Sequence, residues 1–254
     1  MSDSALQTPP RVGLFATCLV DLMRPTVGFA AVQLLEDAGC AVTVPAAQTC
    51  CGQPAYNSGD MRAARKIARK QIEAFEGFDY VVAPSGSCAG MLKIHYPALF
   101  KNDAAWKERA ENLASRTHEL LSFLADVMHF EPAGVSLSAR ATYHDGCSGL
   151  RELGIKAQPR ALLAFVDGLT MTEAGEAETC CGFGGLFCVK YPDVSTHITD
   201  AKIDDALKTN ASALLGGDLG CLLNIEGRLR RRGIGMAVHH AAEVLAGMAG
   251  NEEA

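Results

Sequence analysis

The sequence lacks long apolar runs, a basic surface and a leader-like start, and each absence excludes a class of protein. No run of 18 apolar residues occurs among the 254 residues, so we expect no membrane-spanning helix. The formal net charge is −6 at pH 7, whereas nucleic-acid surfaces need clustered Lys and Arg, so we expect no nucleic-acid partner. Residues 1–10 lack the basic and apolar segments of a signal peptide, which predicts a cytoplasmic protein.

The motifs of hydride-transferring enzymes are missing as well. The glycines of "GFGG" (182–185) and "GGDLG" (216–220) do not form the Gly-x-Gly-x-x-Gly pattern that binds dinucleotides between a strand and a helix. No pair of candidate catalytic carboxylates stands out either. We therefore expect that this chain cannot remove a hydride from a substrate unaided.

Ten cysteines are the most informative feature that is present. In a reducing compartment they are poor candidates for disulfides, which favours metal ligation or redox chemistry. Eight of them form two quartets with nearly equal spacing, a first, an adjacent pair and a last, which indicates an internal duplication. The quartets are Cys18, Cys50, Cys51 and Cys88, and then Cys147, Cys180, Cys181 and Cys221.

The two repeats share one order of expected elements. A β-prone run precedes the first cysteine ("VGLFATC", "ATYHDGC"), a helical stretch and a short strand lead to the cysteine pair, and a second helix and a strand lead to the last cysteine. This β-α-β-α-β order predicts an α/β fold of two similar Rossmann-like units with parallel sheets, related by a pseudo-two-fold axis. Since such sheets gather functional residues at the carboxyl ends of their strands, each quartet should converge there.

The chain divides into four expected segments. Residues 1–10 should be a disordered N-terminus, 11–100 the first repeat and 140–254 the second repeat. The stretch between the repeats begins with the charged amphipathic pattern "NDAAWKERAENLASRTHELLSFLADVM" and ends with "EPAGVSLSAR". We therefore expect a helical connector followed by a linker over residues 101–139.

Four thiolates at one edge of a sheet suit either zinc or an iron–sulfur cluster. Structural zinc sites usually use Cys-x₂₋₄-Cys pairs, and neither quartet contains one. Two adjacent cysteine ligands require a sharp turn, which Gly52 and Gly182 permit because glycine tolerates positive φ. A cluster can bind neighbouring thiolates on different irons, so the pattern favours iron and sulfur over zinc.

Three further side chains lie near the second quartet in the sequence. His144 and Asp145 could relay protons or orient a ligand, or they could form a hydrogen-bonded structural pair. Cys188 could neighbour the second centre or pack as a small hydrophobe, as we expect for Cys40. The candidate residues around the ligands are therefore Gly52, Gly182, His144, Asp145 and Cys188.

The duplicated Cys…Cys-Cys-Gly…Cys arrangement resembles the CCG cysteine-rich domain family, which includes subunits of heterodisulfide reductase and glycolate oxidase. The strings "FATCLVDLMRPTVG", "QTCCGQPAYNSGD", "CCGFGGLF" and "DLGCLLNIEGRLRRRG" are similar to the lactate-utilization branch of that family, from about Arg11 to Ala246. The resemblance implies an iron–sulfur electron-transfer subunit of a three-protein complex that oxidises L-lactate without NAD. It also implies two partner subunits, one of them a further iron–sulfur protein.

The sequence departs from the heterodisulfide reductase pattern at two positions. In those relatives a Cys-x-x-Cys supplies a fifth thiolate to a noncubane cluster that cleaves disulfides, but Met91 and Asn224 stand at the corresponding places here. Four thiolates per repeat favour one ordinary 4Fe–4S cluster in each. The alternatives are a heterodisulfide or thiol–disulfide reductase subunit and a zinc-binding structural scaffold. A further departure is Ser148, where the family pattern leads us to expect histidine.

Overall fold

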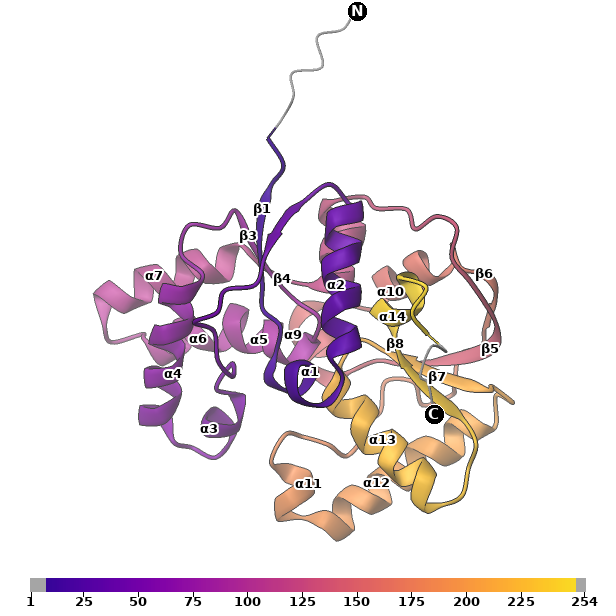
Figure 1. Cartoon of the computed structure of the whole chain (residues 1–254). Coiled ribbons are helices and arrows are strands. Elements are labelled where there is room, and N and C mark those ends of the chain that lie inside the picture. Colours follow the sequence, from indigo (N-terminus) through magenta and orange to yellow (C-terminus); the bar gives the residue numbers. More distant parts are fainter. Residues whose placement is uncertain (1–7, 250–254) are drawn as a thin grey trace, which may run out of the picture.

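The computed structural model describes residues 8–249, so residues 1–7 of the expected disordered N-terminus lie outside the described residues. Two four-stranded sheets form the centre of the molecule, and all of their paired strands run parallel. The strand orders are β2-β1-β3-β4 and β6-β5-β7-β8 (Figure 1). The same order in both halves confirms the predicted α/β fold of two similar units.

The first unit is built around strands that end at the cysteine-bearing loops. Its strands are β1 (Arg11–Leu14), β2 (Ala41–Thr43), β3 (Tyr80–Ala83) and β4 (Thr117–Glu119). Its helices are α1 (Cys18–Met23), α2 (Pro25–Asp37), α3 (Gln53–Asn57), α4 (Met61–Ala74), α5 (Gly86–Gly90), α6 (Tyr96–Leu99), α7 (Ala104–Ser115) and α8 (Leu120–Ser122). Two π-helical turns, η1 (Met91–His95) and η2 (Phe123–Val127), extend α5 and α8.

The second unit repeats this plan with fewer helices. Its strands are β5 (Ser136–His144), β6 (Asp167–Met171), β7 (Ala213–Gly216) and β8 (Ala237–His240). Its helices are α9 (Cys147–Leu153), α10 (Ala157–Leu163), α11 (Phe187–Lys190), α12 (Pro192–Leu207), α13 (Leu219–Arg231) and α14 (Ala241–Leu245). Across both units, no helix of the described residues is long and apolar enough to cross a bilayer.

The segment between the repeats differs from expectation at two places. β4 lies inside the stretch expected to be helical, and it pairs with β3 in the first sheet. Three residues carry too little periodicity to reveal a strand whose stability comes from its neighbour. β5 begins at Ser136, inside the expected linker, and its first residues alternate between exposed and half-buried positions, as in a strand with one face toward solvent. The division of the chain into residue ranges stays a prediction.

The contacts between the units come in reciprocal pairs. Helix α5 of the first unit packs on α9 of the second, and α13 of the second unit packs on α1 of the first. In the same way α2 packs on α14, and α10 packs on α8. Each contact thus occurs twice with the roles of the units exchanged, which is the pattern that a two-fold axis between similar units produces.

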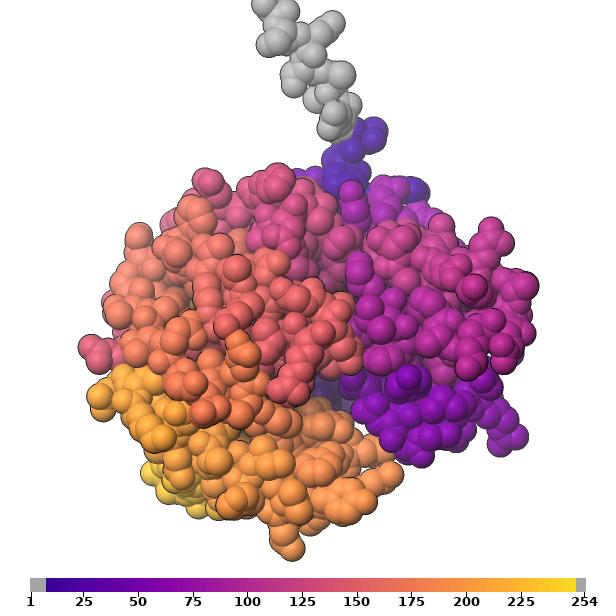
Figure 2. Space-filling model, turned by 180° about the vertical axis from the view of Figure 1, so that it is seen from behind, coloured from indigo at the N-terminus to yellow at the C-terminus, as the bar shows by residue number. Residues whose placement is uncertain are grey.

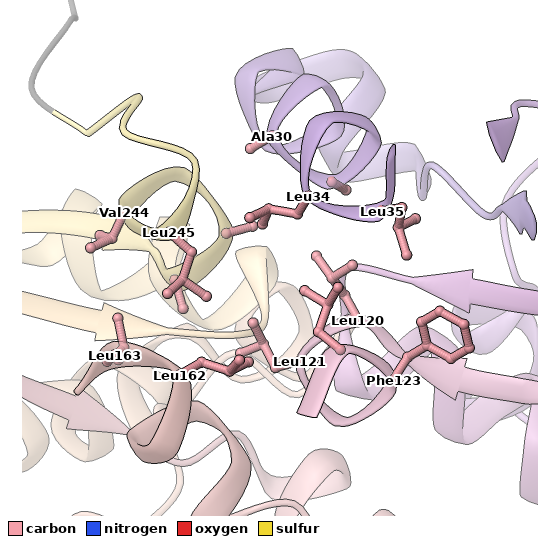
Figure 3. Close-up of a cluster of buried hydrophobic side chains, with 14 of the residues drawn as sticks. Ala30, Leu34, Leu35, Leu120, Leu121, Phe123, Leu162, Leu163, Val244 and Leu245 are labelled. Atoms are coloured by element: carbon pink, nitrogen blue, oxygen red, sulfur yellow. The ribbon is translucent and has the colours of Figure 1, made fainter. Parts of the chain in front are cut away.

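One hydrophobic core is shared by the two units. Leu34 on α2 points toward Leu245 on α14, and Leu35 points toward Leu120 of α8, with leucines of α10 beneath (Figure 3). The apolar side chains of both sheets join this cluster, so the units are covered by each other rather than by solvent. From behind, the two halves of the chain meet along a continuous seam (Figure 2).

Candidate metal centres

The first quartet lies at the carboxyl ends of the strands, as the parallel sheet predicts. Cys18 is the first residue of α1, which follows β1, and Cys88 is in α5, which follows β3. Cys50 and Cys51 lie in the loop before α3, where Gly52 has a φ of 83° and turns the chain. Cys51 and Cys88 are buried, while Cys18 and Cys50 are partly exposed.

The second quartet has the same construction. Cys147 is the first residue of α9 after β5, and Cys221 is in the first turn of α13 after β7. Cys180 and Cys181 precede Gly182, whose φ of 85° repeats the turn at Gly52. The positive φ expected of both glycines is confirmed. Helices α1, α5, α9 and α13 carry the first and the last cysteine of each quartet. These four helices gather at the centre of the molecule (Figure 1).

The thiols of each quartet interact with one another. In the first quartet, hydrogen bonds from Cys18 and Cys51 lower the pKa of Cys50, and the same contacts raise the pKa values of its two neighbours. Cys51 in turn contacts Cys88. In the second quartet, Cys180 has the lowered pKa for the same reason. The sulfur atoms of each quartet therefore contact one another, and thiols gathered in this way can act together as metal ligands.

Backbone N–H groups point at these sulfur atoms. Gly52 donates to the Sγ of Cys50 at 3.4 Å, and Gly182 donates to the Sγ of Cys180 at 3.3 Å. Phe183 donates to the Sγ of Cys181 at 3.5 Å. Since N–H groups and helix N-termini stabilise negative charge, the loops suit an anionic thiolate centre.

Each quartet borders a cavity. All four cysteines of the first quartet line one of about 620 Å³, and all four of the second line one of about 860 Å³. The two cavities share part of their lining. The shared residues are Gln53, Ser87, Phe183, Gly185 and Asp218. The two candidate centres therefore lie on either side of one wall, to which both units contribute.

His144 is placed beside the second quartet. A ring nitrogen of His144 and the Sγ atoms of Cys181 and Cys221 all lie within 4.8 Å of one another. The side chain is 1% exposed, and burial lowers its pKa to about 3, so the imidazole is neutral. Within residues 8–249, neither ring nitrogen has a hydrogen-bond partner.

The other sequence candidates lie further from the cavities. Asp145 accepts two hydrogen bonds from Arg160, at 2.8 and 2.9 Å, which makes it part of a structural ion pair. Cys188 is half-buried on α11, with its thiol 3.5 Å from the carbonyl oxygen of Gly185, and it is not among the described residues that line either cavity. Cys40 is buried in the core, as expected of a packing residue.

Several supporting residues were missed from the sequence. Asp218 caps α13 by accepting from the N–H of Gly220, and it also accepts from the hydroxyl and the N–H of two serines at the start of α5, Ser85 and Ser87. Ser85 is in turn the N-cap of α5. Ser85 stands three residues before Cys88, and Asp218 stands three residues before Cys221. A capping residue at the same distance before the last cysteine of each quartet is the sequence signal that could have identified both residues. Their contact with each other depends on the packing of the two units.

The donor sets fit a thiolate-bound metal group. Each quartet brings four thiols to one cavity, and four thiolates can bind either a zinc ion or an iron–sulfur cluster. Among the described residues, the one group of three or more His, Cys, Asp or Glu side chains whose ligand atoms all lie within 4.8 Å of one another is the trio of His144, Cys181 and Cys221.

The fold and the site define a class of protein, namely an α/β protein of two similar units with four converging cysteines in each. A family model described as the CCG cysteine-rich domain matches residues 12–93 and again residues 141–226. The chain belongs to the CCG cysteine-rich domain family.

Within that family it is a close homologue of Lactate utilization protein A. It is 51% identical to the protein of that name from Exiguobacterium sp., an alignment that covers 93% of this chain and 97% of the relative. It is 50% identical to the one from Geobacillus kaustophilus, with 92% and 98% covered. It is also 49% identical to the one from Macrococcus caseolyticus, with 92% and 96% covered.

A solved structure shares the fold. A hypothetical protein from Helicobacter pylori superposes with a TM-score of 0.67 at 11% identity, over 97% of this chain and 51% of that one. This chain therefore spans about half the length of that protein, and the likeness concerns the fold alone.

Proposed function

We propose that this protein is an iron–sulfur electron-transfer subunit of a cytoplasmic multi-protein complex that oxidises L-lactate without NAD. The observation that carries the proposal is the pair of adjoining Cys₄ sets, each at the carboxyl edge of a parallel sheet. The name of the homologues at about 50% identity supports lactate utilization as the process. The partners are the other subunits of the complex, one of them a further iron–sulfur protein.

One 4Fe–4S cluster per quartet suits the chemistry of the donors. Four thiolates supply one ligand to each of four irons, and the adjacent cysteines of each quartet, without a Cys-x₂₋₄-Cys pair, favour this cluster over zinc. When bound, such clusters accept and release single electrons. The chain's own residues hold the thiolates in place, direct the N–H groups of Gly52 and Gly182 at them, and bury Cys51 and Cys181 away from water.

Disulfide reduction is the weaker candidate because the position of a fifth thiolate is filled in each unit. Met91 is fully buried in the apolar core beside Cys51 and Cys88. The amide of Asn224 donates to the carbonyl oxygen of Cys181 at 3.0 Å and to the hydroxyl of Thr199 at 2.9 Å. Both side chains make structural contacts, so neither supplies a fifth ligand to a cluster.

Metal analysis of the anaerobically purified chain tests the cofactor. We expect about eight iron and eight sulfide atoms per chain, together with the visible absorbance that such clusters give and zinc does not. Cys88→Ser and Cys221→Ser should each lose about half of the iron, while Cys40→Ser and Cys188→Ser, outside the quartets, should keep it. Stoichiometric zinc without sulfide, or full iron in the quartet variants, would contradict the proposal.

An activity assay tests the place in the complex. The purified chain alone should not reduce a dye with L-lactate, whereas the chain mixed with the other two subunits should, and Cys51→Ser should abolish that rate. Cys40→Ser is the matched control and should leave the rate unchanged. Turnover by the chain alone, or an undiminished rate with Cys51→Ser, would refute the electron-transfer role.

A further inference from the structure

We propose that His144 donates a hydrogen bond from its ring N–H to a sulfur atom of the second centre, so that an electron shared by the two centres resides on the second. The inference rests on the proposed function, because it requires a cluster in each quartet. It assigns a positioning role to a side chain that has no other described partner.

The first argument is the unpaired imidazole. A neutral histidine carries one N–H donor and one acceptor nitrogen, and leaving such groups buried without a partner is unfavourable because their hydrogen bonds to water are lost. Native proteins therefore satisfy nearly all of them. His144 is 1% exposed and its ring lies against the sulfur atoms of Cys181 and Cys221. A sulfur of the bound centre is the acceptor that this geometry offers.

The second argument distinguishes a hydrogen-bond donor from a ligand. The four cysteines of the second quartet already provide one thiolate for each iron of a 4Fe–4S cluster. No iron is then left for a ring nitrogen. The imidazole reaches the centre from the end of β5, behind the buried cysteines, where it can contact a sulfur atom.

The third argument is that the position equivalent to His144 in the first unit holds a residue without a hydrogen-bond donor in its side chain. Phe15 stands three residues before Cys18, as His144 stands three before Cys147. It is fully buried and packs on Phe75, with ring centroids 5.6 Å apart, so it offers no polar atom. A reduced cluster carries one more negative charge, and a hydrogen bond to its sulfur stabilises that charge and raises the reduction potential.

A second difference between the units is balanced by its neighbours. The buried residues of α4 and α12 follow the same spacing, and Gln71 of α4 corresponds to Lys202 of α12. The Lys202 ammonium donates to the carbonyl oxygens of Glu176 and Ala177, and it faces two carboxylates, Asp205 and Asp145. Because these charges offset one another, we assign the difference in potential to His144 rather than to Lys202.

Potentiometric titration monitored by EPR tests the inference on one centre at a time. In the Cys88→Ser chain the second centre alone is complete, and adding His144→Phe should lower its reduction potential. In the Cys221→Ser chain the first centre alone is complete, and adding Phe15→His should raise its potential. His144→Gln, which keeps an N–H donor, should preserve most of the wild-type potential.

Nitrogen hyperfine spectroscopy gives a second readout. In Cys88→Ser protein labelled with ¹⁵N-histidine and reduced with dithionite, we expect a weak nitrogen coupling, of the size given by a hydrogen bond rather than by iron ligation. His144→Phe should remove this coupling, whereas His95→Phe, at a histidine that lines the cavity of the second quartet, should keep it. A strong coupling typical of direct ligation would overturn the donor role, and so would the absence of any coupling.

The failure of this inference differs from the failure of the proposed function. Iron and sulfide present in full, with the potential of the second centre unaffected by His144→Phe, would overturn the inference alone. A chain that binds no iron and sulfide under anaerobic conditions would overturn both.

Discussion

Gly182 occupies a position where a side chain does not fit. Its φ is 85°, and a Cβ atom there would lie 2.6 Å from the carbonyl oxygen of Ser195 and 2.7 Å from the hydroxyl oxygen of Thr199. The backbone of the second cysteine loop is thus pressed against α12. The close approach fixes the direction of the N–H that donates to Cys180.

We expect Gly182→Ala to destabilise the protein by more than about 2 kcal/mol, since it adds a clash to the cost of positive φ. It should also release the iron of the second centre only. Gly59→Ala is the matched control, because Gly59 has a φ of 84° with no atom within 4 Å of the added carbon. Urea unfolding and iron content measure both effects, and equal losses for the two variants would contradict the packing argument.

Glu119 makes stability depend on pH. It is 3% exposed, one carboxylate oxygen accepts from the N–H of Ser122, and the other has no partner within the described residues. Burial raises its pKa from 4.5 to about 7. The folded state therefore holds a proton that the unfolded state releases above pH 4.5, so stability is highest below that pH and falls as the pH rises to about 7.

The full loss is up to about 3 kcal/mol, at about 1.36 kcal/mol per pKa unit. We expect Glu119→Gln to remove this fall and to stabilise the protein at pH 8, while Glu111→Gln, at an exposed position, changes nothing. Urea unfolding between pH 4.5 and 8 measures the difference. An unchanged pH profile in Glu119→Gln would show that this carboxyl group is ionised in the folded protein.

At the scale of elements, Asp218 joins the starts of two helices from different units. One oxygen caps α13, and the other accepts from the N–H of Ser87 at 2.9 Å and from the hydroxyl of Ser85 at 3.0 Å. These bonds fix the helix starts that carry Cys88 and Cys221. A change at this residue should therefore reach both centres.

We expect Asp218→Ala to cost about 2–4 kcal/mol, since it removes a cap and leaves buried donors unpaired. Asp60→Ala, which removes the exposed cap of α4, should cost only about 1 kcal/mol. Chemical unfolding gives the energies, and iron content should fall at both centres in Asp218→Ala alone. An Asp218→Ala protein as stable as Asp60→Ala would show that the contact between the helix starts contributes little.

The β-α-β-α-β order of each repeat could be predicted from the sequence, because turn residues and the two cysteine spacings repeat in both halves, whereas the short strand β4 could not. The quartets could be predicted for the same reason, since parallel strands bring their carboxyl ends to one edge. The hydrogen bond between Ser85 and Asp218 could not be predicted from the sequence, because it joins residues 133 positions apart. The isolation of His144 could not be predicted either, since an unpaired ring nitrogen is a property of packing rather than of spacing.

At the scale of the whole molecule, a buried ion pair ties the first helices to the last. Arg24, before α2, donates to Glu243 on α14 at 2.9 Å, and Thr26 donates to the same carboxylate. The other oxygen of Glu243 accepts from the N–H of His240. The contact spans 219 positions in the chain and lies beside the shared core.

Glu243→Ala should destabilise the protein by about 3–5 kcal/mol, because it removes a buried carboxylate that pairs with the Arg24 guanidinium and accepts from the Thr26 hydroxyl. Glu226→Ala breaks the exposed pair with Arg230 and should cost less than about 1 kcal/mol. Since the pair joins the units, we expect one cooperative unfolding transition whose midpoint shifts in Glu243→Ala. Circular dichroism measures this transition. Two separate transitions would show that the units unfold independently.

The reciprocal packing of α2 on α14 and of α10 on α8 bears on the origin of the chain. A single unit would expose the apolar faces of both helix pairs, and a second copy of the same unit would cover them through a symmetric, self-complementary interface. An ancestor of half this length could therefore have folded as a homodimer with two identical centres. Gene fusion would have freed the two positions before the first cysteines to diverge, one to Phe15 and the other to His144, so that two equal centres became a pair with a preferred direction.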